Sequence, residues 1–180
     1  MALTKLNNQS LSAVTSAGIP IRSGSIVQVK YTQLTTAATQ AWSSNTPTAF
    51  TDLTVNITPT STSSKIKLEC HIAGEFSDDN ATYDHVVFFY RDTTALKFSG
   101  STSGSKVGIS AITRTHYASD DNSTGEAGYF TYFDSPNTTS QITYKLGIVS
   151  NIAATFYINT TVNTSDEYFV SNISATEVAA

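Results

Sequence analysis

From Ser25 onward, apolar and polar residues alternate along the chain with the two-residue period of β-strands. The clearest case is residues 65–70, in which Ile66, Leu68 and Cys70 alternate with charged side chains. Such a pattern predicts a strand with one buried and one solvated face. Similar runs predict eight to nine strands in all, at residues 25–34, 50–57, 65–70, 85–92, 106–117, 128–135, 141–150, 154–162 and 168–178.

The segments between these runs are rich in Gly, Pro, Asn, Asp and Ser, which are the residues that favour turns. No segment keeps the three-four spacing of an amphipathic helix over ten or more residues. A chain of eight or more strands must either stack two sheets or close on itself. We therefore predict an all-β protein, an antiparallel β-sandwich of jelly-roll-like type, formed by residues 25–180.

Residues 1–24 differ from the rest because their aliphatic side chains follow neither the strand nor the helix period. Small polar residues separate them, and Gly and Pro punctuate the end of the segment. We expect an extended N-terminal arm that orders on binding another surface. Its candidate attachment residues are Leu3, Leu6, Leu11, Val14 and Ile19.

Two of the predicted strands, 85–92 and 128–135, are apolar on both faces. A strand of this kind is expected to be buried on both faces, each packed against another part of the protein or against a partner. One interpretation is that a loop or the arm covers the second face, and the other is that a neighbouring subunit does. Under the second interpretation, the candidate subunit contacts are Val87, Phe89, Phe130 and Tyr132.

The composition supports a β-protein, since only 13% of the 180 residues are charged and Thr, Ser and Asn take their place. The net charge is −4 and the basic residues are scattered singly, which argues against a nucleic-acid partner. The single Cys70 excludes an internal disulfide and, on an apolar strand face, is expected to be buried and inert. With no signal-peptide core and no long apolar span, neither secretion by the usual route nor membrane insertion is expected.

Catalytic motifs were sought among the three histidines, His71, His85 and His116. No Gly-x-Ser-x-Gly elbow is present, and Cys70 lies in strand pattern rather than at a turn. His71 is expected on the solvated face of its strand, opposite Cys70. The sequence therefore predicts a protein that is not an enzyme.

Acidic residues offer few further sites. The pairs 78–79 and 120–121 lack the ligand spacing of a calcium loop and are expected to be solvated turn acids. A pair of carboxylates for glycoside hydrolysis could come from Glu75, Glu126 or the Asp turns, although any acidic β-protein offers as much. We expect no metal and no cofactor.

Several segments together resemble small structural proteins of tailed bacteriophages, which are common in marine and cyanobacterial phages. The most specific are "TPTSTSSKIKLEC" at 58–70 and "DSPNTTSQITYKL" at 134–146, and the similarity extends over about residues 24–180. The start "LNNQSL" also occurs in such proteins. The resemblance implies a jelly-roll-like sandwich that assembles as a homotrimer on the virion surface, and it carries over no catalytic residue.

These observations lead to three hypotheses. The first is a head decoration or head-fibre protein that the arm attaches to capsid or tail proteins. The second is a receptor-binding tail-fibre domain that contacts a host surface glycan or protein through Tyr83 and Tyr117. The third is a non-viral carbohydrate-binding or carbohydrate-active domain.

Overall fold

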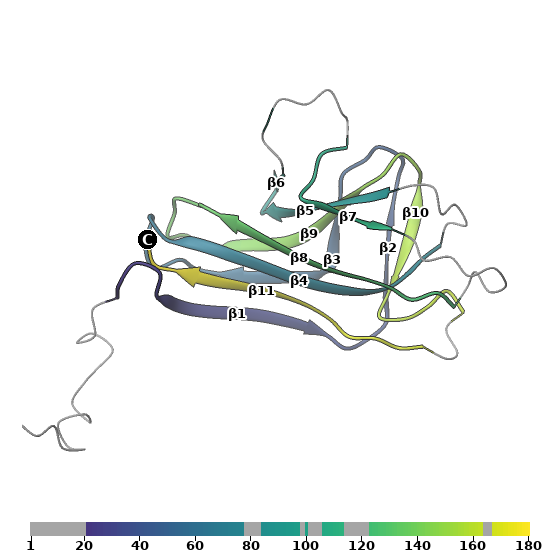
Figure 1. Ribbon diagram of the computed structural model, residues 1–180, viewed down its shortest axis with the longest axis horizontal. Helices are drawn as coiled ribbons and strands as arrows, with labels where there is room; N and C mark the ends of the chain where they lie inside the picture. The colour runs from purple at the N-terminus through teal and green to yellow at the C-terminus, as the bar shows by residue number, and fades with distance from the viewer. Residues whose placement is uncertain (1–20, 78–83, 98–99, 101–105, 114–122, 164–166) are drawn as a thin grey trace, which may run out of the picture.

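The structure is a computed structural model that describes residues 21–77, 84–97, 100, 106–113, 123–163 and 167–180. The described residues form eleven strands in two antiparallel sheets, as predicted for a β-sandwich (Figure 1). The first sheet has the order β1 (Ile26–Leu34), β11 (Ser171–Val178), β4 (Lys65–Phe76), β10 (Ala154–Ile158) and β2 (Ala38–Trp42), and β8 (Glu126–Asp134) also pairs with β4. The second has the order β3 (Thr48–Ile57), β9 (Ile142–Val149), β5 (Asp84–Arg91) and β6 (Thr94–Leu96), and β7 (Ser110–Thr113) also pairs with β5.

The strand pairs are nested along the chain. β1 pairs with β11, β2 with β10, β3 with β9, and β4 with β8, while β5 pairs with β6 and β7. The chain therefore runs outward and returns along itself as one long hairpin. Folding this hairpin over places the two sheets face to face with their apolar sides together.

The core lies between the sheets and follows the predicted alternation. On β4, Ile66, Leu68 and Cys70 are fully buried, whereas Lys67 and Glu69 lie on the outer face and remain partly accessible. Phe50, Phe76 and Phe156 fill the middle of the sandwich with edge-to-face ring contacts. This part of the pattern is confirmed.

Two short strands were not predicted, and three predicted strands are shorter than expected among the described residues. β10 ends at Ile158 rather than at 162, β11 begins at Ser171 rather than at 168, and the start of β7 is also later. The sequence pattern predicts no strand within residues 35–47, but β2 lies there and pairs with β10, and the pattern predicts no strand at β6 either. Residues 106–109 are not strand, and β7 begins only at Ser110. Both missed strands are three to five residues long and depend on a partner strand rather than on their own pattern.

The expected subunit contacts lie in the core of the single chain, which corrects that prediction. Val87, Phe89 and Phe130 are buried between the sheets, and Tyr132 packs against the same cluster. Phe88, on the other side of β5, is also buried. The Ile109 amide donates to the Val87 carbonyl oxygen, so residues near 109 lie along β5. Cover from within the chain therefore accounts for the burial of Val87, Phe88 and Phe89 on β5.

Candidate interaction surface

The outer face of β1, β11, β4 and β8 is the most distinctive surface of the described residues. These four strands lie side by side in Figure 1, and their pairing fixes which side chains share this face. Directly opposed residues of paired strands point to the same side of a sheet. The face therefore consists of three rows: Val29, Thr176, Lys67 and Phe133; Tyr31, Ser174, Glu69 and Thr131; Gln33, Asn172, His71 and Tyr129.

The large apolar side chains of this face stand on its two marginal strands. Val29 and Tyr31 on β1 are 51% and 74% exposed, and Tyr129 and Phe133 on β8 are 61% and 59% exposed. We call Tyr31, Tyr129 and Phe133 the aromatic margins. Three strand spacings, about 14 Å, separate β1 from β8. Such a set of exposed apolar residues on one sheet face is typical of a contact surface.

The two central strands, β11 and β4, carry polar side chains, which we call the polar middle: Thr176, Ser174, Asn172, Lys67, Glu69 and His71. The Lys67 Nζ lies 2.8 Å from the Glu69 carboxylate, which also accepts a hydrogen bond from the Tyr129 hydroxyl. The hydrogen bond from Lys67, and then that from Tyr129, lower the pKa of Glu69. The same bond to Glu69, with burial, raises the pKa of Tyr129. The polar middle thus holds a charged Lys67 and a charged Glu69 whose opposite charges cancel locally.

His71 lies on this face, as the alternation predicted, and is half-buried. Its Nδ1 is 3.2 Å from the Val170 carbonyl oxygen. On the opposite side of the strand, burial strongly raises the pKa of the Cys70 thiol, which is the behaviour expected of an inert core cysteine.

A second distinctive region, the arm end, lies where the described chain begins. Ile21 and Ile26 are 63% and 68% exposed there, although both are large and apolar. A hollow of about 370 Å³ lies beside Ile21 and is lined by Ile21, Val27, Thr60, Ser61, Ser63, Ser64, Ala179 and Ala180. The Gly24 amide donates to the Ala179 carbonyl oxygen, and the Ala179 amide donates to Ser25. The C-terminus and the start of β1 therefore meet at one end of the sandwich (Figure 1).

Beside the hollow, the fully buried Glu177 holds three segments together. One carboxylate oxygen accepts hydrogen bonds from the Thr60 amide, the Thr60 hydroxyl and the Ser64 hydroxyl, each at 2.7 Å. The other oxygen accepts from Gln28 Nε2 at 2.6 Å. Burial raises the pKa of Glu177, but these hydrogen bonds outweigh burial, and the net effect is a lowered pKa. The Pro/Ser/Thr-rich turn before β4 is thus fixed to β1 and β11.

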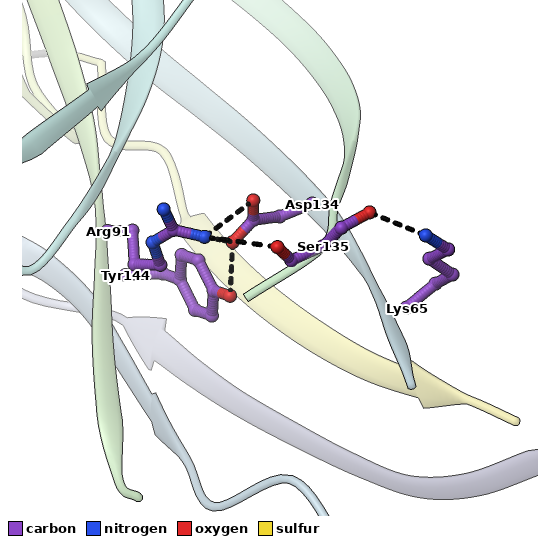
Figure 2. Close-up of polar contacts among 5 residues, drawn as sticks. All are labelled: Lys65, Arg91, Asp134, Ser135 and Tyr144. Atoms are coloured by element: carbon purple, nitrogen blue, oxygen red, sulfur yellow. Dashed lines mark hydrogen bonds and ion pairs between the residues drawn. The ribbon is translucent and has the colours of Figure 1, made fainter. Parts of the chain in front are cut away.

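A polar cluster links the two sheets at the ends of β5, β8 and β9, as Figure 2 shows. Arg91 Nη1 lies 3.1 Å from both carboxylate oxygens of Asp134, and the Tyr144 hydroxyl donates to the same carboxylate at 2.7 Å. Lys65 donates to the Ser135 hydroxyl nearby. Burial first, and then the bond to Asp134, raise the pKa of Tyr144. Because all these groups satisfy one another, the cluster stabilises the packing of the sheets.

The residues considered for catalysis have structural partners. Glu75 accepts hydrogen bonds from the Thr124 amide and hydroxyl and from the Val162 amide, and Glu126 accepts one from the Phe76 amide. His85 is buried and stacks on the Phe76 ring with centroids 3.9 Å apart. These carboxylates therefore fix backbone segments at the end of β4.

His116 and the acidic pairs 78–79 and 120–121 lie outside the described residues. Within the described ranges, no group of three or more His, Cys, Asp or Glu is placed to hold a metal ion. The same ranges contain no helix of the length and apolarity needed to cross a membrane.

The structure brings few of the predicted site residues together. The attachment residues Leu3, Leu6, Leu11, Val14 and Ile19, and the receptor candidates Tyr83 and Tyr117, fall outside the described residues. The aromatic margins were not predicted. The sequence signal was the second apolar face of 128–135, but only the pairing of β8 with β4 shows that Tyr129 and Phe133 point outward while Phe130 points into the core.

Comparisons with protein-family models and with curated proteins find no match for the chain.

Proposed function

We propose that this protein is a structural protein of a bacteriophage virion, displayed on the particle surface and attached through its N-terminal arm. It acts by binding rather than by catalysis. The observation that carries the proposal is the arm end, where Ile21 and Ile26 are exposed and Ile21 borders a hollow with a partly apolar lining. Apolar side chains exposed in this way are suited to burial against another protein.

The internal polar groups fit a role in shape rather than in chemistry. Glu177 and Asp134 are each bonded to several partners that join separate segments. Such buried networks rigidify a fold and specify one arrangement of its parts. A surface protein of a particle benefits from a rigid body of this kind, because its function is the surface that it presents.

Homotrimer formation belongs to the same proposal and rests on the resemblance to phage structural proteins. The arm end is the natural place for the copies to meet, since three arms that leave side by side would attach together. Once one arm is bound, the other two are held close to their sites, so three weak contacts together give tight attachment. The nested strand pairs favour the jelly-roll arrangement that the resemblance implies.

Head decoration or head-fibre attachment is the first form of the proposal, and a receptor-binding tail-fibre domain is the second. The aromatic margins favour a recognition role in either form, since exposed Tyr and Phe are typical of binding surfaces. Immunogold labelling of intact particles separates the two forms by the place of the label. The proposal predicts label on the particle exterior, and particles without exterior label contradict it.

Multi-angle light scattering tests the trimer independently. The chain has a mass of 19.3 kDa, so a homotrimer scatters as a particle of three times that mass. A species that stays at the monomer mass at micromolar concentration would contradict this part of the proposal and leave the particle location open.

A further inference from the structure

We propose that the outer face of β1, β11, β4 and β8 binds a neutral polysaccharide chain of a cell surface. This inference deepens the proposed function by naming a ligand class, and it rests on that function in taking the face to be displayed. The surface concerned is distinct from the arm end.

The first argument is the placement of the aromatic side chains. Tyr31 stands on one margin, and Tyr129 and Phe133 stand on the other, four residues apart on β8 and so separated by roughly 13 Å. Aromatic rings offer flat apolar faces against which the C–H faces of sugar rings pack. An extended ligand with several sugar units can contact two or more of these rings at once.

The second argument is the chemistry of the polar middle. The Asn172 amide lies beside His71, and the Ser174 and Thr176 hydroxyls lie beside Glu69 and Lys67. Gln33 and Thr131 extend the polar rows onto the marginal strands. These groups both donate and accept hydrogen bonds, which is the requirement for recognising sugar hydroxyls. The combination of aromatic surfaces with a few convergent polar groups is typical of ligand sites.

The third argument concerns charge. Lys67 and Glu69 form an ion pair 2.8 Å apart, so the middle of the face carries little net charge. The whole chain has a net charge of −4. This face has no excess positive charge to attract an acidic polysaccharide, and the negative net charge of the chain would repel one. The face therefore suits a neutral ligand.

A second copy of the chain fits this face less well. Stable protein interfaces usually have an apolar centre and a polar rim. Here the order is reversed, since the apolar residues stand at the margins and the ion pair of Lys67 and Glu69 lies in the middle. Covering the middle with another protein would remove these charges from water, at a cost that few pairs recover. A ligand rich in hydroxyl groups can replace the lost water contacts.

The test is affinity electrophoresis of the full chain in native gels that contain mannan, dextran or laminarin as neutral probes, or alginate as an acidic probe. The proposal predicts that at least one neutral probe retards the wild-type protein. Tyr31→Ser and Tyr129→Ser should each weaken that binding at least fivefold. The control Tyr168→Ser makes the same change at a similarly exposed tyrosine that lies outside the three rows, and it should bind as the wild type does.

Tyr129→Phe keeps the ring and removes only the hydroxyl that bonds Glu69, so it should retain more binding than Tyr129→Ser. Circular dichroism and melting temperatures identify any variant that fails to fold, and Phe133→Ser then serves as a replacement. No retardation by the neutral probes, retardation by alginate alone, or equal binding by the margin variants and Tyr168→Ser would each overturn the proposal. So would loss of self-association in the margin variants without any glycan binding by the wild type, because a second copy would then occupy the face.

These outcomes are independent of particle labelling. A protein that is found on the virion exterior but binds no neutral probe would retain the proposed function and lose this inference.

Discussion

Among the described residues, Glu75, Glu126, Asp134 and Glu177 are carboxylates buried from solvent, and each accepts hydrogen bonds from residues distant in the sequence. Burying a charge is costly unless it is paired or hydrogen-bonded. Each carboxylate therefore favours one arrangement of the segments around it, because moving a donor segment would leave the buried carboxylate with fewer hydrogen bonds. At the residue scale, the buried acids determine how the turns attach to the sheets.

The first prediction concerns Glu177→Gln. Glutamine keeps one acceptor oxygen, but its amino group would face a donor of Gln28, Thr60 or Ser64. We expect a loss of about 1–3 kcal/mol in the free energy of unfolding, measured by urea denaturation at pH 7. The control is Glu69→Gln on the outer face, where the loss should stay below about 1 kcal/mol. Equal losses in the two variants would contradict the role of Glu177.

The second prediction follows from the lowered pKa of Glu177. A carboxylate with a lower pKa in the folded than in the unfolded chain stabilises the fold above its usual pKa. This stabilisation is lost as the pH falls through the lowered folded-state value. Unfolding free energies measured between about pH 6 and pH 3 should therefore decline less steeply for Glu177→Gln than for the wild type. Parallel declines would show that the carboxylate contributes no pH dependence.

The third prediction concerns Arg91→Met. This change removes the only ion-pair partner of Asp134 that the described residues show, and leaves a carboxylate that is mostly buried with the Tyr144 hydroxyl. Breaking such a pair from one side should cost about 2–4 kcal/mol in the free energy of unfolding, measured by thermal and urea denaturation. The control, Lys65→Met, removes an exposed contact to Ser135 in the same cluster and should cost less than about 0.5 kcal/mol.

At the scale of elements, β4 is the longest strand and joins the parts of the first sheet. Its first seven residues pair with β11, its last three pair with β10, and β8 follows the other edge. Gly74 lies where β4 pairs with β10, and a Cβ there would be 2.0 Å from the Tyr157 carbonyl oxygen. The absence of a side chain at this position therefore allows the two strands to approach.

The fourth prediction is that Gly74→Ala destabilises the protein by at least about 2 kcal/mol, because the backbone of β10 must move to admit the methyl group. Chemical denaturation gives the value. Gly24→Ala is the matched comparison: its Cβ meets no atom within 4 Å, and its φ of 84° alone should cost roughly 1–2 kcal/mol. A smaller loss for Gly74→Ala than for Gly24→Ala would contradict the close approach.

The sequence predicted strand positions and buried faces best where one face of the strand is exposed to solvent. The alternation of Ile66, Leu68 and Cys70 with charged residues identified β4 and its buried face correctly. It failed for β2, whose residues 38–42 are mostly small or polar and form a strand because β10 pairs with them. It also failed to choose between the faces of β5 and β8. When both sides of a strand are apolar, only the register against its neighbours decides which side chains are buried.

The candidate surface was hidden for the same reason. Val29 and Tyr31 on β1 are far in sequence from Tyr129 and Phe133 on β8, and no local pattern shows that the four share one face. The order of strands in the sheet brings them together. The buried role of Glu177 was equally beyond the sequence, since its donors come from residues 28 and 60–64.

At the scale of the whole molecule, the proposed recognition face and the proposed attachment end are different parts of the surface. The fifth prediction is that deletion of residues 2–20 leaves a folded sandwich, because β1 begins at Ile26 and Gly24 is bonded to Ala179. The melting temperature should change by no more than a few degrees, and the truncated protein should no longer join particles. A truncated protein that does not fold would place the arm in the core, and one that assembles at normal occupancy would exclude the arm as the anchor.

The central claim is that this chain is displayed on the outside of a phage particle, and imaging of intact particles tests it most directly. Antibodies raised against the full chain would be bound to purified virions, and the label located by electron microscopy. The account predicts label at regular positions on the exterior of the head or tail. Label that appears only after the particles are disrupted, or that never accompanies them, would contradict the claim.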